Sequence, residues 1–207
     1  MTSIDFIHDT TFESLPKSTI KEAVRCFVDT LGVAVGGSQT QVAHIIHNHA
    51  ARQFGGDAAT LWQDGRRVSA AGAALANAMT IDSLDAHDGH KLTKGHVGCG
   101  VLPGLIAMME AEGKADAHEL LTSIVIGYEI GTRAGIALHA SACDYHTSGA
   151  WIALATAALG ARQLGLTTAQ TREAVGIAEY HGPRSQMMRC IDAPTMVKDG
   201  SGWGAMV

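Results

Sequence analysis

Apolar residues recur every three or four positions along most of this chain, and that spacing places them on one face of an α-helix. The first such run begins after Pro16, continues to Val35 and is ended by Gly36 and Gly37. Proline in the first turn and glycine after the last turn are the usual boundaries of a helix. The same periodicity predicts further helices over residues 41–54, 69–79, 101–112, 115–138, 150–164 and 168–178.

One segment breaks the helical pattern. Residues 59–68, with the sequence ATLWQDGRRV, place an Asp-Gly pair between two short flanks, which is typical of a β-hairpin. No low-complexity linker and no internal repeat divides the chain. We therefore expect one mainly α domain over residues 1–207, a multi-helix, bundle-like fold with a small β-hairpin.

Single residues predict where two of the helices begin. Pro103 is expected near the start of the helix at 101–112. Thr167 or Thr168 is expected to be the N-cap of the helix at 168–178. The last residues, GSGWGAMV, are small and apolar and carry no charge cluster. They are typical of the opening of another helix that has been cut off, so we expect the chain to be part of a larger protein.

Composition narrows the class of protein. A hydrophobic content of 46% with a charged content of 17% excludes intrinsic disorder, and the formal charge of -5 gives no reason to expect nucleic acid or an anionic membrane as a partner. The N-terminus has no signal peptide pattern and no stretch is long and apolar enough for a bilayer, so we expect a cytoplasmic protein. The cysteines form no CxxC pair, which argues against disulfides and zinc ribbons: Cys26, Cys99, Cys143 and Cys190.

The densest chemistry lies in residues 82–103, which read DSLDAHDGHKLTKGHVGCGVLP. Carboxylates and imidazoles gathered beside an apolar helix start provide the groups for pKa tuning and proton transfer. The first candidates for catalysis are Asp85, Asp88 and His96. A structural alternative remains open, because an aspartate can cap a helix and His96 can satisfy a buried carbonyl.

The dipeptide His87-Asp88 also allows a metal site of the HD phosphohydrolase type, since imidazole and carboxylate suit a divalent ion. Such a site needs further ligands, which His44, His47 or His49 could supply from the helix at 41–54. Exposed histidines on a polar helix face are the plainer interpretation of those three residues. We therefore expect neither a metal nor another cofactor.

Two later segments carry further candidates. His146 lies in DYHTSG before a predicted helix, where it could act as an acid or base or hold a carboxylate. Lys198 lies in PTMVKDGSGWG, before a glycine-rich helix start that suits an anionic group, although the glycine spacing is not that of a Walker A loop. Taken alone, each could be an ordinary residue of a cap or a solvated loop.

Several segments together resemble the MmgE/PrpD family, which includes 2-methylcitrate dehydratase, cis-aconitate decarboxylase and iminodisuccinate epimerase. The resemblance rests on LPKSTIKEAVRCFVDTLGVAVGG, AAGAALANAMTIDSLDAHDGH, GHVGCGVLPGLIAMMEAEG, ELLTSIVIGYEIGTRAG and LGARQLGLTTAQTREAVGIA, in this order. It implies that Asp85, His96, His146 and Lys198 line the active site. The chain also departs from the family pattern: Val97 replaces a proline, His87 an aspartate and Gly89 a threonine, and the His146 loop lacks its proline.

The resemblance also implies a function and an architecture. We expect a metal-independent lyase that removes a proton from a small di- or tricarboxylate, with catalytic Asp85, His96 and His146. Lys198, Asp88 and His90 are expected to contact the substrate. Dehydration of 2-methylcitrate is the first expectation because of its frequency in the family. Epimerase or decarboxylase activity of the same family, and a non-catalytic truncated domain, remain alternatives. The family further implies a homodimer and a second, smaller α+β domain that this chain lacks.

Overall fold

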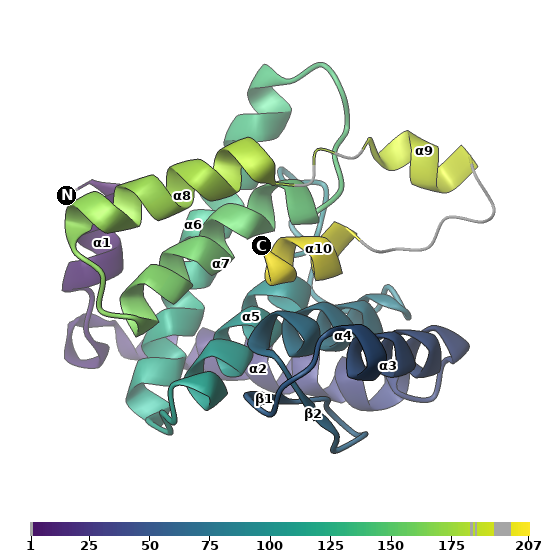
Figure 1. Cartoon of the computed structure of the whole chain (residues 1–207). Coiled ribbons are helices and arrows are strands. Elements are labelled where there is room, and N and C mark those ends of the chain that lie inside the picture. The colour runs from purple at the N-terminus through teal and green to yellow at the C-terminus, as the bar shows by residue number, and fades with distance from the viewer. Residues whose placement is uncertain (1, 183, 185, 193–199) are drawn as a thin grey trace.

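The computed structural model describes residues 2–182, 184, 186–192 and 200–207, and it is built almost entirely of helices. The predicted mainly α fold with one small hairpin is confirmed (Figure 1). The helices in chain order are α1 (Ser3–Asp9), the short 3-10 helix η1 (Phe12–Ser14), α2 (Lys17–Gly37), α3 (Gln41–Gln53), α4 (Ala70–Asp82), α5 (Gly98–Ala111), α6 (Ala117–Ser141), α7 (Gly149–Gln163), α8 (Thr168–His181), α9 (Met187–Asp192) and α10 (Gly200–Met206). The hairpin pairs β1 (Ala59–Thr60) with β2 (Arg67–Val68) in antiparallel register.

The alanine-rich helix α4 lies at the centre of the fold, with other helices packed around it. It consists largely of alanine and is buried along nearly its whole length, so small side chains let neighbouring helices approach it from several directions. It packs against α3, α5 and α10, and α5 in turn packs against α6 and α7. Helix α10, last in the sequence, thereby lies beside helices from the middle of the chain (Figure 1).

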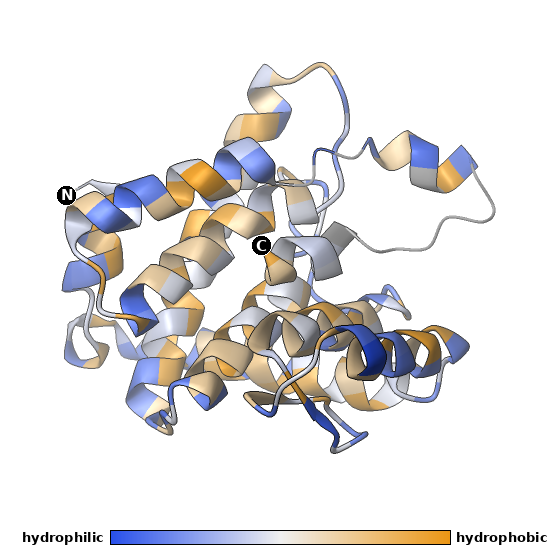
Figure 2. Cartoon of the chain, in the orientation of Figure 1, coloured by the Kyte–Doolittle hydropathy of each residue, from blue (hydrophilic) through white to orange (hydrophobic). Residues whose placement is uncertain are grey.

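The buried apolar side chains form two clusters. One gathers around α5, α6 and α7, with Leu102, Trp151 and Ile152 among its fully buried members. The other joins α3 and α4 to the hairpin through residues such as Ile46 and Leu61. In Figure 2 helices α4, α5 and α7 are mostly tan to orange, while α3 and α8 alternate between blue and orange segments. Burial of the apolar faces is the main favourable contribution to this fold.

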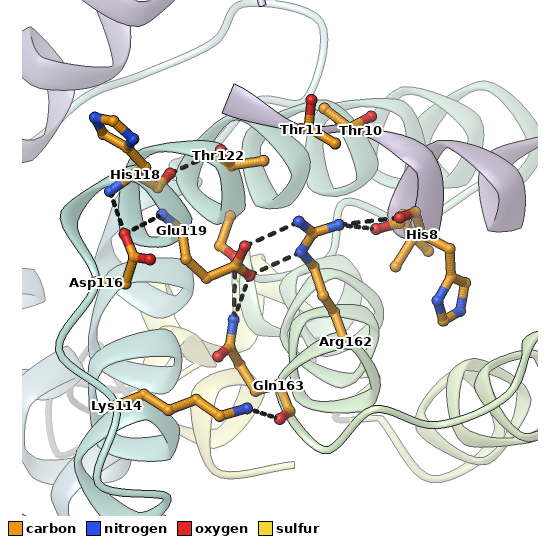
Figure 3. A network of polar contacts seen from close by, with 12 residues as sticks. His8, Thr10, Thr11, Lys114, Asp116, His118, Glu119, Thr122, Arg162 and Gln163 are labelled. Atoms are coloured by element: carbon orange, nitrogen blue, oxygen red, sulfur yellow. Dashed lines mark hydrogen bonds and ion pairs between the residues drawn. The ribbon is translucent and has the colours of Figure 1, made fainter. Parts of the chain in front are cut away.

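A polar network fastens the N-terminal helix to the bundle (Figure 3). Arg162 on α7 donates to both carboxylate oxygens of Glu119 on α6, at 2.8 and 2.9 Å, and to the carbonyl of Ile7 on α1 at 2.6 Å. Gln163 donates to Glu119 at 2.8 Å, and Lys114 contacts the carbonyl of Gln163. A bidentate guanidinium–carboxylate pair fixes direction as well as distance, so three helices meet here in one geometry.

Some predicted boundaries are wrong. Helix α5 begins at Gly98 rather than near Pro103, which lies inside the helix and leaves the carbonyl one turn earlier without its usual N–H partner. Helix α6 continues to Ser141, and the short helices α1 and α9 were not predicted at all because they are too brief for a periodic pattern. Thr167 is the N-cap of α8, with a complete capping box, as one of the two expected residues. The final segment forms a helix, as expected.

Candidate active site

The loop between α4 and α5 holds most of the predicted site residues. It leaves α4 at Asp82 and closes on itself where the His90 N–H donates to the Gly95 carbonyl at 2.9 Å. Thr93 reinforces this closure by donating to the His90 carbonyl at 3.0 Å. Asp85 has a φ of 51°, in the left-handed region that aspartate tolerates better than most residues. The loop is therefore ordered by its own hydrogen bonds and presents its side chains at fixed positions.

Asp85 and His96 face each other across this loop. The Nε2 atom of His96 lies 3.3 Å from Oδ1 of Asp85, and its Nδ1 atom contacts the backbone carbonyl of Asp88. A carbonyl oxygen only accepts hydrogen bonds, so Nδ1 carries the hydrogen and the neutral ring has its lone pair on Nε2. Two acceptors then point at each other, and a proton arriving at Nε2 would be stabilised by the adjacent carboxylate. Such an arrangement can serve general base catalysis, with the carboxylate stabilising the imidazolium that forms.

His87 lies directly behind this pair. Its side chain is fully buried, and its ring is 4.2 Å from the ring of His96, measured between centroids. The Nε2 atom of His87 is 3.5 Å from Oδ1 of Asp82, the last residue of α4. Sequence analysis attached His87 only to a possible metal site, and no spacing rule could show that its ring packs against that of His96.

Asp88 has a different environment from Asp85. Its carboxylate is largely buried at the first turn of α5, with both oxygens 3.3 Å from the Gly98 N–H. Burial raises the pKa of Asp88, and the Gly98 N–H partly opposes that shift because it stabilises the anion. The carboxylate thus holds the N-terminus of α5, while the carbonyl of the same residue orients His96. Its predicted contact with substrate stays a prediction.

The loop before α7 meets the first loop. The Ser148 hydroxyl accepts from the His96 N–H at 3.1 Å, and the Tyr145 hydroxyl contacts the Lys94 carbonyl. A Cβ atom at Gly95 would lie 2.3 Å from Oγ of Ser148, so only glycine permits this approach. His146 is buried in this second loop. Two segments far apart in the sequence therefore form one wall.

The ring of His146 is held within its own loop. Its Nδ1 atom lies 3.0 Å from the carbonyl of Asp144, which leaves Nε2 as the basic nitrogen of the neutral ring. The N–H of His146 donates to Nε2 of His139, at 3.3 Å. Burial is the largest cause that lowers the pKa of His139, which favours its neutral, accepting form.

The structure says less about the two remaining predicted site residues, His90 and Lys198. The His90 side chain is exposed on the outer part of the loop, and Lys198 lies outside the described residues. Ser148 is a residue that sequence reasoning did not single out, although it belongs to the same DYHTSG segment as His146. Only the contact between the Ser148 hydroxyl and the His96 N–H identifies this residue, and that contact depends on the tertiary structure.

The metal site of the HD type is not assembled as the sequence allowed. Asp88 turns its carboxylate to Gly98, and His47 on α3 contacts Thr80 at 3.0 Å and Asp64 at 3.7 Å. Within the described residues, the side chains grouped closely enough to share an ion are instead those of Asp85, His87 and His96. The histidines of α3 are not part of that group.

Comparison with known proteins shows the family to which this chain is similar. The chain matches the MmgE/PrpD N-terminal domain over residues 4–204. It is 31% identical over 183 residues to cis-aconitate decarboxylase of Homo sapiens, covering 84% of this chain and 38% of the human protein. The Mus musculus protein of the same name is 30% identical over 188 residues, covering 84% of this chain and 37% of the mouse protein. A cis-aconitate decarboxylase-like protein of Aspergillus oryzae is 30% identical over 122 residues, covering 55% of this chain and 25% of the fungal protein.

Proposed function

Because this chain belongs to the MmgE/PrpD family, we propose that it supplies the acid/base wall of a lyase active site for a small di- or tricarboxylate. The observation that supports this best is the orientation of His96, with Nδ1 on the Asp88 carbonyl and Nε2 facing Asp85. The chain spans little more than a third of the human and mouse relatives, so the activity of a complete protein is part of the proposal.

The proposed chemistry is proton transfer at a carbon next to a carboxylate. Neutral His96 takes the proton at Nε2, and the negative charge of Asp85 stabilises the imidazolium that forms. For dehydration, the same imidazolium then gives the proton to the departing hydroxyl group, which leaves as water. Decarboxylation instead starts from protonated His96, which gives its proton to carbon as the bond to the carboxylate breaks and carbon dioxide leaves, and solvent water then restores the proton. General acid/base catalysis of this kind contributes about 10²–10⁴-fold to a rate.

His146, Asp88, His90 and Lys198 complete the proposed site in different ways. The basic Nε2 of His146 suits a second proton carrier, or a carboxylate contact when the ring is protonated. Lys198 is proposed to bind a substrate carboxylate, as expected from its place before α10. Asp88 acts through His96 and α5, and exposed His90 lies where a substrate carboxylate could approach the loop.

The choice of reaction rests on the relatives. Their names concern cis-aconitate and favour decarboxylation of an unsaturated tricarboxylate as the first reaction to assay. Dehydration of 2-methylcitrate, preferred from the sequence, is the second candidate, because elimination of water needs a base that takes a proton from carbon and an acid that gives one to the departing hydroxyl group. We further propose a homodimer, which rests on the family, and a cytoplasmic location, which rests on the pattern of the sequence.

The test is turnover and isotope exchange with the purified chain. Cis-aconitate, 2-methylcitrate and iminodisuccinate are incubated in D₂O and followed by NMR, because deuterium that enters at carbon reports proton transfer there, by exchange of the substrate or by protonation of a decarboxylated product. We expect the substitutions His96→Gln and Asp85→Asn to lower exchange and turnover, the first by about 10²-fold or more. His44→Gln, an exposed histidine on α3, serves as the control.

The outcomes separate the alternatives. Carbon dioxide release identifies a decarboxylase, loss of a hydroxyl group a dehydratase, and exchange without loss of a group an epimerase. Full activity of His96→Gln would contradict the role of this histidine. Absence of both exchange and turnover with every substrate would contradict the proposal for this chain and support the non-catalytic alternative.

A further inference from the structure

Asp85, His87 and His96 form a cluster of potential metal ligands that the proposed reaction does not require. One ligand atom from each residue lies within 4.8 Å of the other two. The set comprises two imidazoles and one carboxylate, which is a donor combination found at zinc and other first-row metal sites. Mg²⁺ prefers oxygen ligands, so it should bind weakly to a set with two imidazole nitrogens.

The surroundings of the two histidines also resemble those of metal ligands. A ligating histidine usually donates its second ring N–H to a carbonyl or carboxylate, which aims the other nitrogen at the ion. His96 meets this condition through the Asp88 carbonyl, and His87 has its Nε2 atom 3.5 Å from Asp82. The ring of His96 is thus oriented by an oxygen acceptor, and the ring of His87 has a carboxylate oxygen at ion-pair distance.

The contact between His96 and Asp85 supplies a second reason. A lone pair on Nε2 and a carboxylate oxygen stand 3.3 Å apart, and a cation between them removes their repulsion. A proton can fill this role, and so can a metal ion. Ligand bonds to zinc of about 2.0–2.2 Å place ligand atoms roughly 3.3 Å apart, so the loop must tighten around the ion. Asp85 is exposed, so an ion can reach the cluster from solvent on that side, and His87 is buried, so its ring is held in place by packing.

We propose that Asp85, His87 and His96 bind one divalent ion of the zinc type. The ion would occupy the Nε2 lone pair with which His96 accepts a proton. Bound metal would therefore switch off the proposed lyase chemistry, a consequence that rests on the proposed function, whereas the binding itself does not.

The experiment is calorimetric titration of the chain with Zn²⁺ in the presence of millimolar Mg²⁺. We expect one equivalent to bind, and Asp85→Asn and His96→Gln to weaken binding at least about tenfold because each removes a ligand. Asparagine suits the left-handed backbone at position 85, so Asp85→Asn should keep the fold, which circular dichroism checks. His44→Gln is the matched control and should bind as the wild type does.

Substitution of Co²⁺ gives an independent readout. The visible bands of a cobalt site with nitrogen and oxygen ligands should appear in the wild type and fade in both ligand variants. A thiolate charge-transfer band would instead assign the ion to a cysteine and overturn the proposal. So would the absence of binding to the wild type, or equal affinity in wild type, Asp85→Asn and His96→Gln.

The metal and lyase proposals can fail separately. Zinc binding without turnover would contradict only the lyase, and turnover lost in His96→Gln without zinc binding would contradict only the metal site. If both hold, Zn²⁺ should abolish turnover and a chelator should restore it.

Discussion

In the candidate site, each of the two ring nitrogens of His96 has a separate partner. The Asp88 carbonyl determines which nitrogen is basic, and the Asp85 carboxylate lies beside that nitrogen at 3.3 Å. The sequence picked out Asp85 and His96 from residue type and proximity to a helix start. It could not show that the backbone carbonyl of Asp88 contacts the ring of His96, because that contact depends on how the loop folds.

Cysteine reactivity should differ sharply between two residues. Burial raises the pKa of Cys99 well above its usual range, and its Sγ atom contacts the Ser201 hydroxyl at 3.0 Å, whereas Cys143 is exposed. Because the thiolate is the nucleophile, we expect a thiol reagent to label Cys143 in the native protein and to spare Cys99 until denaturant is added.

Peptide mass spectrometry of a labelling time course measures both sites at once. Cys143→Ser is the control, and it should remove the fast signal alone. Equal native-state rates at Cys99 and Cys143 would show that the region where α5 meets α10 opens readily, contrary to this structure.

At the scale of elements, the start of α5 determines where the site loop ends. Gly98 is the first helical residue, and its N–H points to the Asp88 carboxylate. A Cβ atom there would lie 2.3 Å from the Tyr128 hydroxyl oxygen, 2.8 Å from Oδ1 of Asp88 and 2.9 Å from Oγ1 of Thr30. The sequence prediction placed this boundary near Pro103 because proline favours the first turn, whereas packing against α2 and α6 selects glycine at position 98.

We expect Gly98→Ala to lower the free energy of unfolding by about 1–3 kcal/mol, because the added methyl group overpacks this junction. Gly32→Ala on α2 is the control, since a Cβ atom there meets nothing within 4 Å. That change should stabilise the protein by about 0.5–1 kcal/mol, because alanine is the better helix former. Urea unfolding followed by circular dichroism measures both variants, and an unchanged midpoint for Gly98→Ala would contradict the close packing.

Across the whole molecule, polar contacts join segments that are distant in the sequence, and two of these junctions bear on the site and on the N-terminal helix. At one, Ser148 before α7 accepts from the N–H of His96, which assembles the candidate site. At the other, Arg162 and Glu119 tie α6 and α7 to α1 (Figure 3). In the described part of the chain no helix is long and apolar enough to cross a membrane. Both junctions lie between elements whose order in the sequence gives no hint of their contact.

We expect Glu119→Gln to lower the free energy of unfolding by about 2 kcal/mol at neutral pH, because it weakens a charged pair that is largely buried. Burial alone raises the pKa of Glu119, but hydrogen bonding and charge from Arg162 outweigh it and leave the pKa below the ordinary value of 4.5. A carboxylate with a lowered folded-state pKa stabilises the protein above 4.5 and loses this contribution as the pH falls through the folded-state pKa.

The difference between wild type and Glu119→Gln should therefore shrink on acidification below pH 4.5, as measured by urea unfolding at several pH values. Glu129→Gln on the same helix is the control, because its partner Arg133 is exposed and such pairs contribute little. A difference that stays constant with pH would show that the charge of Glu119 is not what stabilises the junction.

The sequence alone determined the helical fold and the small hairpin, because apolar periodicity and capping residues act over a few positions and need no tertiary context. It also drew attention to Asp85, His96 and His146, since their side-chain chemistry is visible in isolation. Tertiary structure decided the rest: that Asp85 faces His96, that His87 packs behind it and that Ser148 joins the two loops. Those pairings depend on which helices pack together, and packing is settled by contacts between residues far apart in the chain.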